Sequence, residues 1–267
     1  MQAALPMYFP PQAALQAFWA ALADVLRADP TIKASDIPAQ LHVAPDLHLQ
    51  WLEPDLLLSQ ACGFPLVTQL AGKVQVVGTF SYHAPGVRGI ACRSQLICRA
   101  NDSRQNLADF AGSTLAFNDT ISQSGYNALR ALVASSTEQR PFFAAANKTG
   151  AHYRSIEAVR QGQADMAAID AVTWAHWQHS HPDLAAELRV FGQTEPYPGL
   201  PLITSLQTPP VLLLALRRAL HTVATATPYA AVRAPLLISG FEATTLADYQ
   251  TCLDMQELAF SKGLQAL

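Results

Sequence analysis

Residues 115–133 read LAFNDTISQSGYNALRALV, and this stretch decides the fold because it joins three different patterns. Ser113 to Phe117 is typical of a strand, and a polar turn follows it from Asn118 to Gln123. After Gly125 the apolar residues recur at the spacing of one helix face, at Ala128, Leu129, Leu132 and Val133. The stretch therefore predicts a strand, a turn and a helix in succession.

Two serines stand where this helix is expected to begin. Ser122 and Ser124 flank Gln123, and serine is a favoured helix N-cap because its hydroxyl accepts a hydrogen bond from a first-turn amide. Hydroxyls, amides without an intrahelical acceptor and the positive end of the helix dipole together favour an anion. The local sequence leaves two interpretations open, an ordinary N-cap and an anion-binding turn.

The composition indicates a globular protein whose ligand would be held by local groups. Half of the 267 residues are hydrophobic and 14% are charged, which is enough apolar material for one large domain or two modest ones. The formal net charge of −3 and the lack of long Lys or Arg runs argue against nucleic acid as a partner. A small anionic ligand would therefore depend on donors placed in its site.

The sequence predicts no direct membrane insertion. It contains no run of the ~18–20 apolar residues that a spanning helix needs, and MQAALPMYFP lacks the basic region and long apolar core of a secretory signal. We expect a first strand from Ala3 to Tyr8, ended by Pro10 and Pro11. Two locations stay open: the periplasm if a signal was removed, and the cytoplasm if Met1 is the native start.

The four cysteines are expected to be buried, reduced thiols. Cys92 and Cys98 are separated by an even number of residues, which places them on one face of an extended segment. Along one strand they would lie too far apart to bond directly. Cys62, in the turn after a strand, is more typical of a small buried residue than of a ligand contact. We expect no cofactor.

Strands and helices alternate along the chain, which predicts an α/β protein with a mostly parallel sheet. The predicted strands are Asp55–Gln60, Val74–Phe80, Ile90–Arg99, Asp165–Asp170 and Arg189–Thr194. The predicted helices are Ala13–Leu26, Pro65–Ala71, Ser155–Gln161, Ala171–Gln178, Val211–Thr225 and Thr244–Ala259.

Several stretches, taken in order, resemble one family. LAFNDTISQSGYNALR resembles the strand, loop and helix start that hold the ligand in the substrate-binding proteins of phosphate/phosphonate-type ABC transporters. GAHYRSIEAVRQGQADMAAIDAVTW is similar to a second signature of that family, and RVFGQTEPYPGLPLIT to its return crossover. LLLSQACGFP and VGTFSYHAPG occur where the family has ligand-facing strand ends. The resemblance covers most of the chain.

This resemblance implies a type II periplasmic-binding-protein fold, an α/β fold of two lobes joined by a double-crossover hinge. Each lobe would be a mixed sheet flanked by helices. Lobe I would comprise residues 1–97 and 193–267, and lobe II residues 98–192, with the ligand cleft between the lobes. Open α/β sheets also favour ligand sites at the carboxyl ends of their strands.

The resemblance also implies a set of ligand-binding residues. Those of lobe II are Ser122, Gln123, Ser124, Gly125, His152 and Asp170, and those at the strand ends of lobe I are Tyr8, Ser59, Gln60 and Tyr82. The family usually has Ser-Thr-Ser before the glycine. We therefore expect Gln123 to make the ligand differ from the usual one, and Gly125 to let the helix backbone approach the ligand.

Two of these residues have alternative interpretations. His152 would donate to an anion, which would favour its charged form; it could instead be a histidine satisfied within the protein. Asp170 would bind an amine or hydroxyl of the ligand, or serve as the N-cap of the helix that begins at Ala171. Tyr197, in the crossover, is a weaker candidate for a ligand contact.

Two further groups of residues could form a metal site or a catalytic triad. His176, His179 and His181 could bind a metal, but a solvated helix end fits their spacing better because Pro182 follows. Ser124, His152 and Asp170 are the residue types of a hydrolase triad, but Ser124 lacks the G-x-S-x-G turn that exposes a nucleophile. We predict neither a metal site nor catalysis by this trio.

The sequence thus predicts a protein that captures a small oxyanion, a phosphonate, phosphate or related compound, for ABC-type uptake or sensing. The resemblance implies an ABC permease as a partner. The alternative is an enzyme that acts on a small metabolite and is built on the same two-lobed fold.

Overall fold

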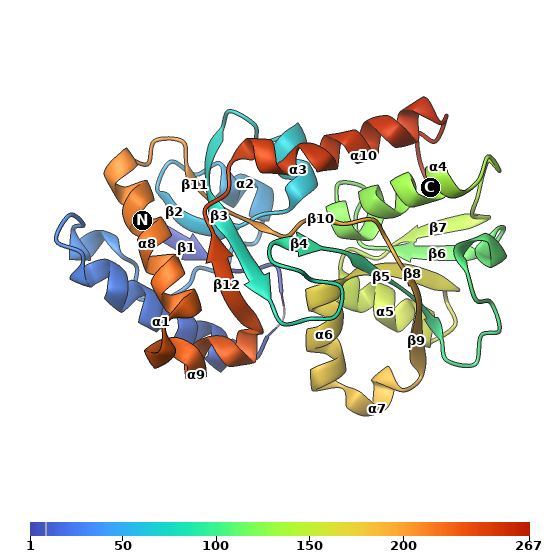
Figure 1. The fold of residues 1–267 in the computed structure, drawn as a ribbon, viewed down its shortest axis with the longest axis horizontal. Helices are drawn as coiled ribbons and strands as arrows, with labels where there is room; N and C mark the ends of the chain where they lie inside the picture. The colour runs from blue at the N-terminus through green and yellow to red at the C-terminus, as the bar shows by residue number, and fades with distance from the viewer. Residues whose placement is uncertain (9) are drawn as a thin grey trace. The chain divides into compact units, whose positions relative to one another are not determined.

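The computed structural model describes residues 1–8 and 10–267, which form two compact units, each with its own five-stranded sheet (Figure 1). The first unit, here the first lobe, comprises Met1–His83, Arg88–Ile90 and Pro198–Tyr249. The second lobe comprises Ala84–Val87, Ala91–Tyr197 and Gln250–Leu267. The predicted fold class, two α/β lobes with mixed sheets, is confirmed.

The sheet of the first lobe has the strand order β1-β2-β11-β3-β12. Its strands are β1 (Gln2–Ala4), β2 (Leu56–Gln60), β3 (Val74–Tyr82), β11 (Pro201–Ser205) and β12 (Ile238–Glu242). β1 runs parallel to β2, whereas β11 is antiparallel to β2 and β3, and β12 is antiparallel to β3. Every residue of β2 and β11 is buried, as in strands covered on both faces.

Helices cover this sheet: α1 (Gln12–Ala28), α2 (Leu47–Trp51), α3 (Gly63–Thr68), α8 (Pro210–Thr225) and α9 (Ala230–Arg233). α1 packs on α8 and α9. Its buried residues, Phe18, Trp19, Leu22, Ala23 and Leu26, recur at helical spacing, so the predicted amphipathic pattern is confirmed. Short 3-10 turns lie at Ala34–Asp36, Thr227–Tyr229, Ala234–Leu236 and Leu246–Tyr249.

The sheet of the second lobe has the order β7-β6-β8-β5-β9. Its strands are β5 (Ser94–Arg99), β6 (Thr114–Phe117), β7 (Ala145–Lys148), β8 (Met166–Asp170) and β9 (Leu188–Gln193). β6 is parallel to β7 and β8, and β5 is antiparallel to β8 and β9. The carboxyl ends of β6 and β8 therefore lie at the same edge, where the turn after Phe117 and the carboxylate of Asp170 are found.

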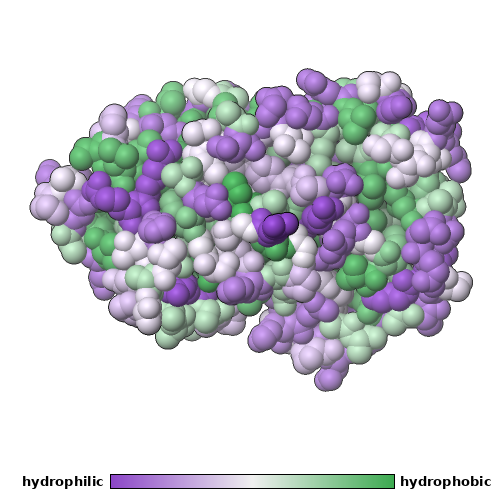
Figure 2. Space-filling model, in the orientation of Figure 1, coloured by the Kyte–Doolittle hydropathy of each residue, from purple (hydrophilic) through white to green (hydrophobic). Residues whose placement is uncertain are grey.

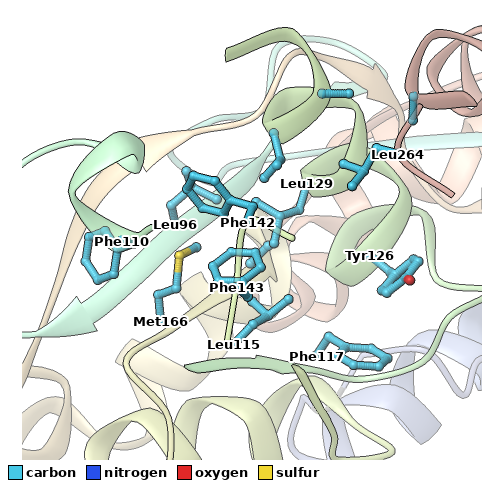
Figure 3. Packing of buried hydrophobic residues seen from close by; sticks show 14 of the residues in the cluster. Leu96, Phe110, Leu115, Phe117, Tyr126, Leu129, Phe142, Phe143, Met166 and Leu264 are labelled. Carbon is cyan, nitrogen blue, oxygen red and sulfur yellow. The ribbon is translucent and has the colours of Figure 1, made fainter. Parts of the chain in front are cut away.

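The helices of the second lobe are α4 (Ala128–Ser136), α5 (His152–Arg160), α6 (Ala171–Ser180), α7 (Pro182–Ala185) and α10 (Gln250–Ser261), with a 3-10 turn at Leu107–Phe110. α10 packs on α4. Figure 3 shows one apolar cluster that contains Leu129 of α4 and Leu264, which follows α10; its other labelled members are Leu96, Phe110, Leu115, Phe117, Tyr126, Phe142, Phe143 and Met166.

Apart from the short segment Ala84–Val87, which belongs to the second lobe, the chain changes lobe at Ile90/Ala91, at Tyr197/Pro198 and again at Tyr249/Gln250. β4 (Ala91–Cys92) and β10 (Tyr197–Pro198), at the first two of these passages, pair in a separate two-stranded sheet. The first two passages match the double crossover that the sequence predicts. The third was not predicted.

The lobe boundaries differ from the predicted ones for two physical reasons. Residues 91–97, predicted as part of lobe I, belong to the second lobe because β5 lies between β8 and β9 in its sheet. Residues 250–267, predicted as part of lobe I, belong to the second lobe because α10 buries Cys252, Met255 and Ala259 there.

Three secondary-structure predictions need correction. The sheets are not mostly parallel, because β11, β12 and β5 run antiparallel to their neighbours. The first strand stops at Ala4 rather than Tyr8. The extended segment from Ile90 to Arg99 is interrupted at Arg93, which separates β4 from β5.

The surface and the cysteines agree with the composition. Figure 2 shows apolar side chains in small groups between polar ones on the visible face. Among the residues that the structure describes, no helix is both long enough and apolar enough to cross a membrane. All four cysteines are buried thiols.

Gly78 in β3 gives a direct test of the first lobe. A Cβ at this position would overlap the Phe241 ring and the Glu242 carbonyl oxygen on β12. Gly240, on β12 itself, has only ordinary contacts, with Ser81 Cβ at 3.6 Å from its ideal Cβ. Gly78→Ala should lower the free energy of unfolding by about 1–3 kcal/mol, and Gly240→Ala by less than about 0.5 kcal/mol, measured by urea denaturation. Equal effects would contradict this packing.

Candidate anion-binding site

The turn after β6 leads into a helix through one wide turn. Ser122 is the N-cap, residues Gln123–Asn127 form a π turn, and α4 continues from Ala128. Asn127 N–H donates to the Ser122 carbonyl over 2.9 Å, and Gly125 N–H donates to Ser122 Oγ over 3.1 Å. The predicted N-cap is confirmed. Because π turns are rare and cluster at functional sites, this start is a candidate site.

A serine and a histidine meet on this turn. Ser124 Oγ lies 2.8 Å from Nε2 of His152, the first residue of α5. The Ser124 carbonyl accepts from Ser94 Oγ over 2.7 Å, and Ser94 Oγ is also 2.7 Å from the Tyr197 hydroxyl. The π turn is therefore held to β5 as well as to α5, and the predicted residues Ser122, Ser124 and His152 lie together.

Gly125 is required by close packing. An ideal Cβ on Gly125 would overlap the Asn118 side-chain oxygen and would lie 3.1 Å from His152 Cε1. The backbone there approaches the Asn118 side chain and the imidazole so closely that no other residue fits without a shift. Its predicted approach to a ligand stays a prediction.

His152 is a neutral histidine at neutral pH. Removal from water lowers its pKa from 6.5 to about 4. Within the described residues, 1–8 and 10–267, its Nδ1 has no hydrogen-bond partner. A proton on Nδ1 would be an unsatisfied buried donor, so the neutral ring is best satisfied with its proton on Nε2, donated to Ser124 Oγ.

Asp170 ends β8 and caps α6. Its Oδ1 accepts from Val172 N–H over 2.8 Å and from Thr173 N–H over 3.1 Å, so the helix-cap interpretation is confirmed. Its Oδ2 lies 3.8 Å from Cys92 Sγ. Burial, and then the Asp170 charge, raise the pKa of the Cys92 thiol well above its usual value. Contact of Asp170 with an amine stays a prediction.

The Gln123 side chain contacts other parts of the second lobe. Its Oε1 accepts from Asn127 Nδ2 over 2.9 Å, and its Nε2 lies 3.1 Å from Met255 Sδ on α10. These contacts connect the residue between the two serines to the C-terminal helix. The predicted contact of Gln123 with a ligand, and its effect on which ligand is bound, stay predictions.

Three of the four predicted first-lobe residues lie at strand ends, whereas Tyr8 follows β1 by four residues. Ser59 and Gln60 end β2, and Tyr82 ends β3. Gln60 Nε2 is 3.3 Å from the Tyr82 hydroxyl, and the Tyr82 ring meets the Tyr8 ring edge-on at 5.3 Å. Three of the four thus contact one another within this lobe, and Ser59 Oγ bonds the Gln60 carbonyl over 3.2 Å. Their contact with a ligand stays a prediction.

The two alternative constellations have little geometric support. His152 Nδ1 has no carboxylate partner in the part of the chain that the structure describes, so Ser124 and His152 lack the third member of a triad. The same described residues contain no group of three His, Cys, Asp or Glu placed to hold a metal ion. In the predicted histidine group His176 is buried whereas His179 is exposed.

Sequence reasoning missed three polar residues beside the turn: Ser94, Asn118 and Asn127. Ser94 carried a usable signal, since it is a small polar residue at an even spacing from Cys92 and Cys98, on the face of the strand where these buried cysteines lie. The roles of Asn118 and Asn127 depend on the π turn, which the helical spacing does not reveal.

Two α/β lobes are the architecture of the periplasmic-binding-protein fold, and in open α/β sheets ligands bind at the carboxyl ends of the strands, where the polar helix start lies. The sequence profile described as "ABC transporter, phosphonate, periplasmic substrate-binding protein" matches residues 53–249. The chain belongs to this family of phosphonate-transporter substrate-binding proteins. No match was found among curated protein sequences.

Solved structures share the fold at low identity. A binding-protein component of an ABC phosphonate transporter from Pseudomonas aeruginosa is 15% identical with a TM-score of 0.77, covering 98% of this chain and 87% of that one. PhnD1 from Prochlorococcus marinus in complex with methylphosphonate is 13% identical with a TM-score of 0.74, covering 98% of each chain. A Xanthomonas citri protein bound to ATP is 15% identical with a TM-score of 0.68, covering 98% of each chain.

The lowered pKa of His152 predicts how stability depends on pH. The unfolded histidine binds a proton below about pH 6.5, whereas the folded one stays neutral until about pH 4. The contribution of neutral His152 is therefore complete above pH 6.5 and is lost as the pH falls from 6.5 to 4. His152→Gln should make the urea-unfolding free energy fall less steeply across that range.

His179→Gln, at an exposed histidine, is the matched control and should keep the slope of the unmutated protein. If His152→Gln also keeps that slope, His152 does not titrate as described.

Proposed function

We propose that this chain binds a small phosphonate or a related oxyanion at the start of the helix Gln123–Ser136, and that it delivers this ligand to an ABC permease. The contact between Ser124 Oγ and His152 Nε2 at the first turn of the helix carries the proposal. The family match supports the phosphorus ligand and the transporter partner.

The two serine hydroxyls are oriented to donate. Ser122 Oγ accepts the Gly125 N–H, and Ser124 Oγ accepts the proton of His152 Nε2 in the favoured tautomer. Each oxygen thus receives one hydrogen bond from the protein, which leaves its own O–H to donate outward. First-turn amides and the helix dipole add to these donors.

The turn binds an anion through dipoles rather than a fixed charge. Asp119, in the same turn, is paired with Lys148 at 2.7 Å. The lysine therefore balances the negative charge of Asp119, which would otherwise repel an anion. A bound phosphonate would favour protonation of His152 and raise its pKa. At a pH between the His152 pKa of the free protein and that of the complex, binding would therefore take up protons.

The family match supports a phosphonate as the ligand class. The contacts of individual residues with that ligand are predictions. Methylphosphonate, bound by the Prochlorococcus relative, is the first compound to test, followed by phosphate. Asp170 remains our candidate to bind an amine or hydroxyl of a substituted phosphonate. Micromolar affinity corresponds to about 8 kcal/mol, which several hydrogen bonds to a charged ligand can supply.

Isothermal titration calorimetry against methylphosphonate, phosphite, phosphate and sulfate tests the proposal. Ser124→Ala removes a hydroxyl donor and the acceptor of His152, and should weaken binding of the best ligand by at least tenfold. Ser136→Ala, at an exposed serine farther along α4, should leave the affinity unchanged. A folded protein that binds none of the four compounds would refute the phosphorus-ligand proposal.

We also propose that binding occurs without turnover. The Ser124–His152 pair lacks a carboxylate on Nδ1 among the described residues, and such a carboxylate orients the base in serine hydrolases. Incubation with p-nitrophenyl phosphate and p-nitrophenyl acetate should release p-nitrophenol at the same rate with unmutated protein as with Ser124→Ala. Faster release by the unmutated protein would favour the enzyme alternative.

A further inference from the structure

The residue between the two serines is joined to the last helix of the chain. Gln123 is 2% exposed, and its carboxamide contacts Met255 Sδ and Asn127 Nδ2, at 3.1 and 2.9 Å. Asn127 Nδ2 also donates to the Cys252 carbonyl of α10 over 2.8 Å. Asn127 and Met255 are themselves buried. The π turn therefore contacts α10 through polar groups as well as through packing.

These contacts continue to the final residues. Asn127 Oδ1 accepts from Arg130 Nη2 over 2.8 Å, and Arg130 Nη1 donates to the Gln265 carbonyl over 3.0 Å. The Tyr126 hydroxyl accepts from Leu267 N–H over 3.0 Å. Leu264 packs in the same apolar cluster as Tyr126 (Figure 3). The segment Gln250–Leu267 thus supports the turn at several points.

Hydrogen bonds in such a dry environment restrict geometry strongly, because a buried amide that loses its partner is left unsatisfied. The backbone of Gln123 cannot rotate without moving this carboxamide. The same rotation would displace its two neighbours, and with them the Ser122 cap and the contact between Ser124 Oγ and His152 Nε2.

We infer that Gln123 is a positioning residue of the anion site, which fixes Ser122 and Ser124 by anchoring their turn to Met255 and Asn127. Its effect on ligand affinity rests on the proposed function. Its effect on His152 does not, because the Ser124–His152 contact exists without a ligand.

Three single variants and one double variant test the inference. Gln123→Ala removes the carboxamide contacts with Met255 and Asn127, Met255→Leu removes only the sulfur acceptor while keeping an apolar side chain of similar size, and the double variant combines these two changes. Val133→Ala, in the buried face of α4 and in the same apolar cluster as Tyr126, is a control that destabilises the same lobe without removing a hydrogen bond of Gln123 or Asn127.

Two measurements are made on each variant. NMR titration of the His152 imidazole without ligand reports on the environment that Ser124 provides. Calorimetry with methylphosphonate reports on the anion site.

Gln123→Ala should raise the measured pKa of His152 by about one unit, because a looser turn admits water, and should weaken methylphosphonate binding about tenfold. Met255→Leu should change both quantities in the same direction but less. The double variant should be no worse than Gln123→Ala, because the two residues act through one contact. Val133→Ala should lower the melting temperature and leave both quantities unchanged.

The outcomes separate the inference from the proposed function. If Gln123→Ala leaves the His152 titration as it is in the unmutated protein, or if Val133→Ala shifts it equally, the positioning role is refuted whether or not a ligand binds. If the unmutated protein binds none of the test anions while Gln123→Ala shifts the His152 titration, the positioning role stands and the phosphorus-ligand proposal fails.

Discussion

The hydrogen bond from Asn127 N–H to the Ser122 carbonyl is the constraint on which the second lobe's candidate site depends. It spans one residue more than an α-helical bond, so the first turn is wider and its side chains point in different directions. The wide turn lets Ser122 cap the helix while Ser124 reaches the imidazole of His152. An ordinary first turn would place these hydroxyls differently.

Close packing around Gly125 complements that hydrogen bond. The Asn118 side chain and the His152 ring occupy the space that a Cβ would need, so the strand end, the π turn and the start of α5 meet at one backbone atom. Sheet order explains why they meet: β6 and β7 are parallel neighbours, and the π turn and α5, which follow them, begin at the same edge. The topology thus places the polar groups, and the glycine sets how closely they approach.

The sequence predicted the elements whose periodicity is strong and missed those that depend on partners. Helix α1 and strand β2 follow from their own apolar patterns, and the serines at the helix start follow from capping preferences. The strands β7, β11 and β12 were missed because β7 is largely exposed, β11 follows a proline-rich connection and β12 contains a glycine. The contact of Gln123 with Met255 was missed for a related reason, since the two residues lie 132 positions apart.

The third passage of the chain between lobes has a consequence for how the protein is made. The first lobe is completed at Tyr249, but the second lobe receives α10 only from Gln250–Ser261. On the ribosome the π turn is translated long before the helix that buries Gln123 and Asn127 emerges. The turn can therefore reach its final geometry only after α10 has left the ribosome and packed on α4.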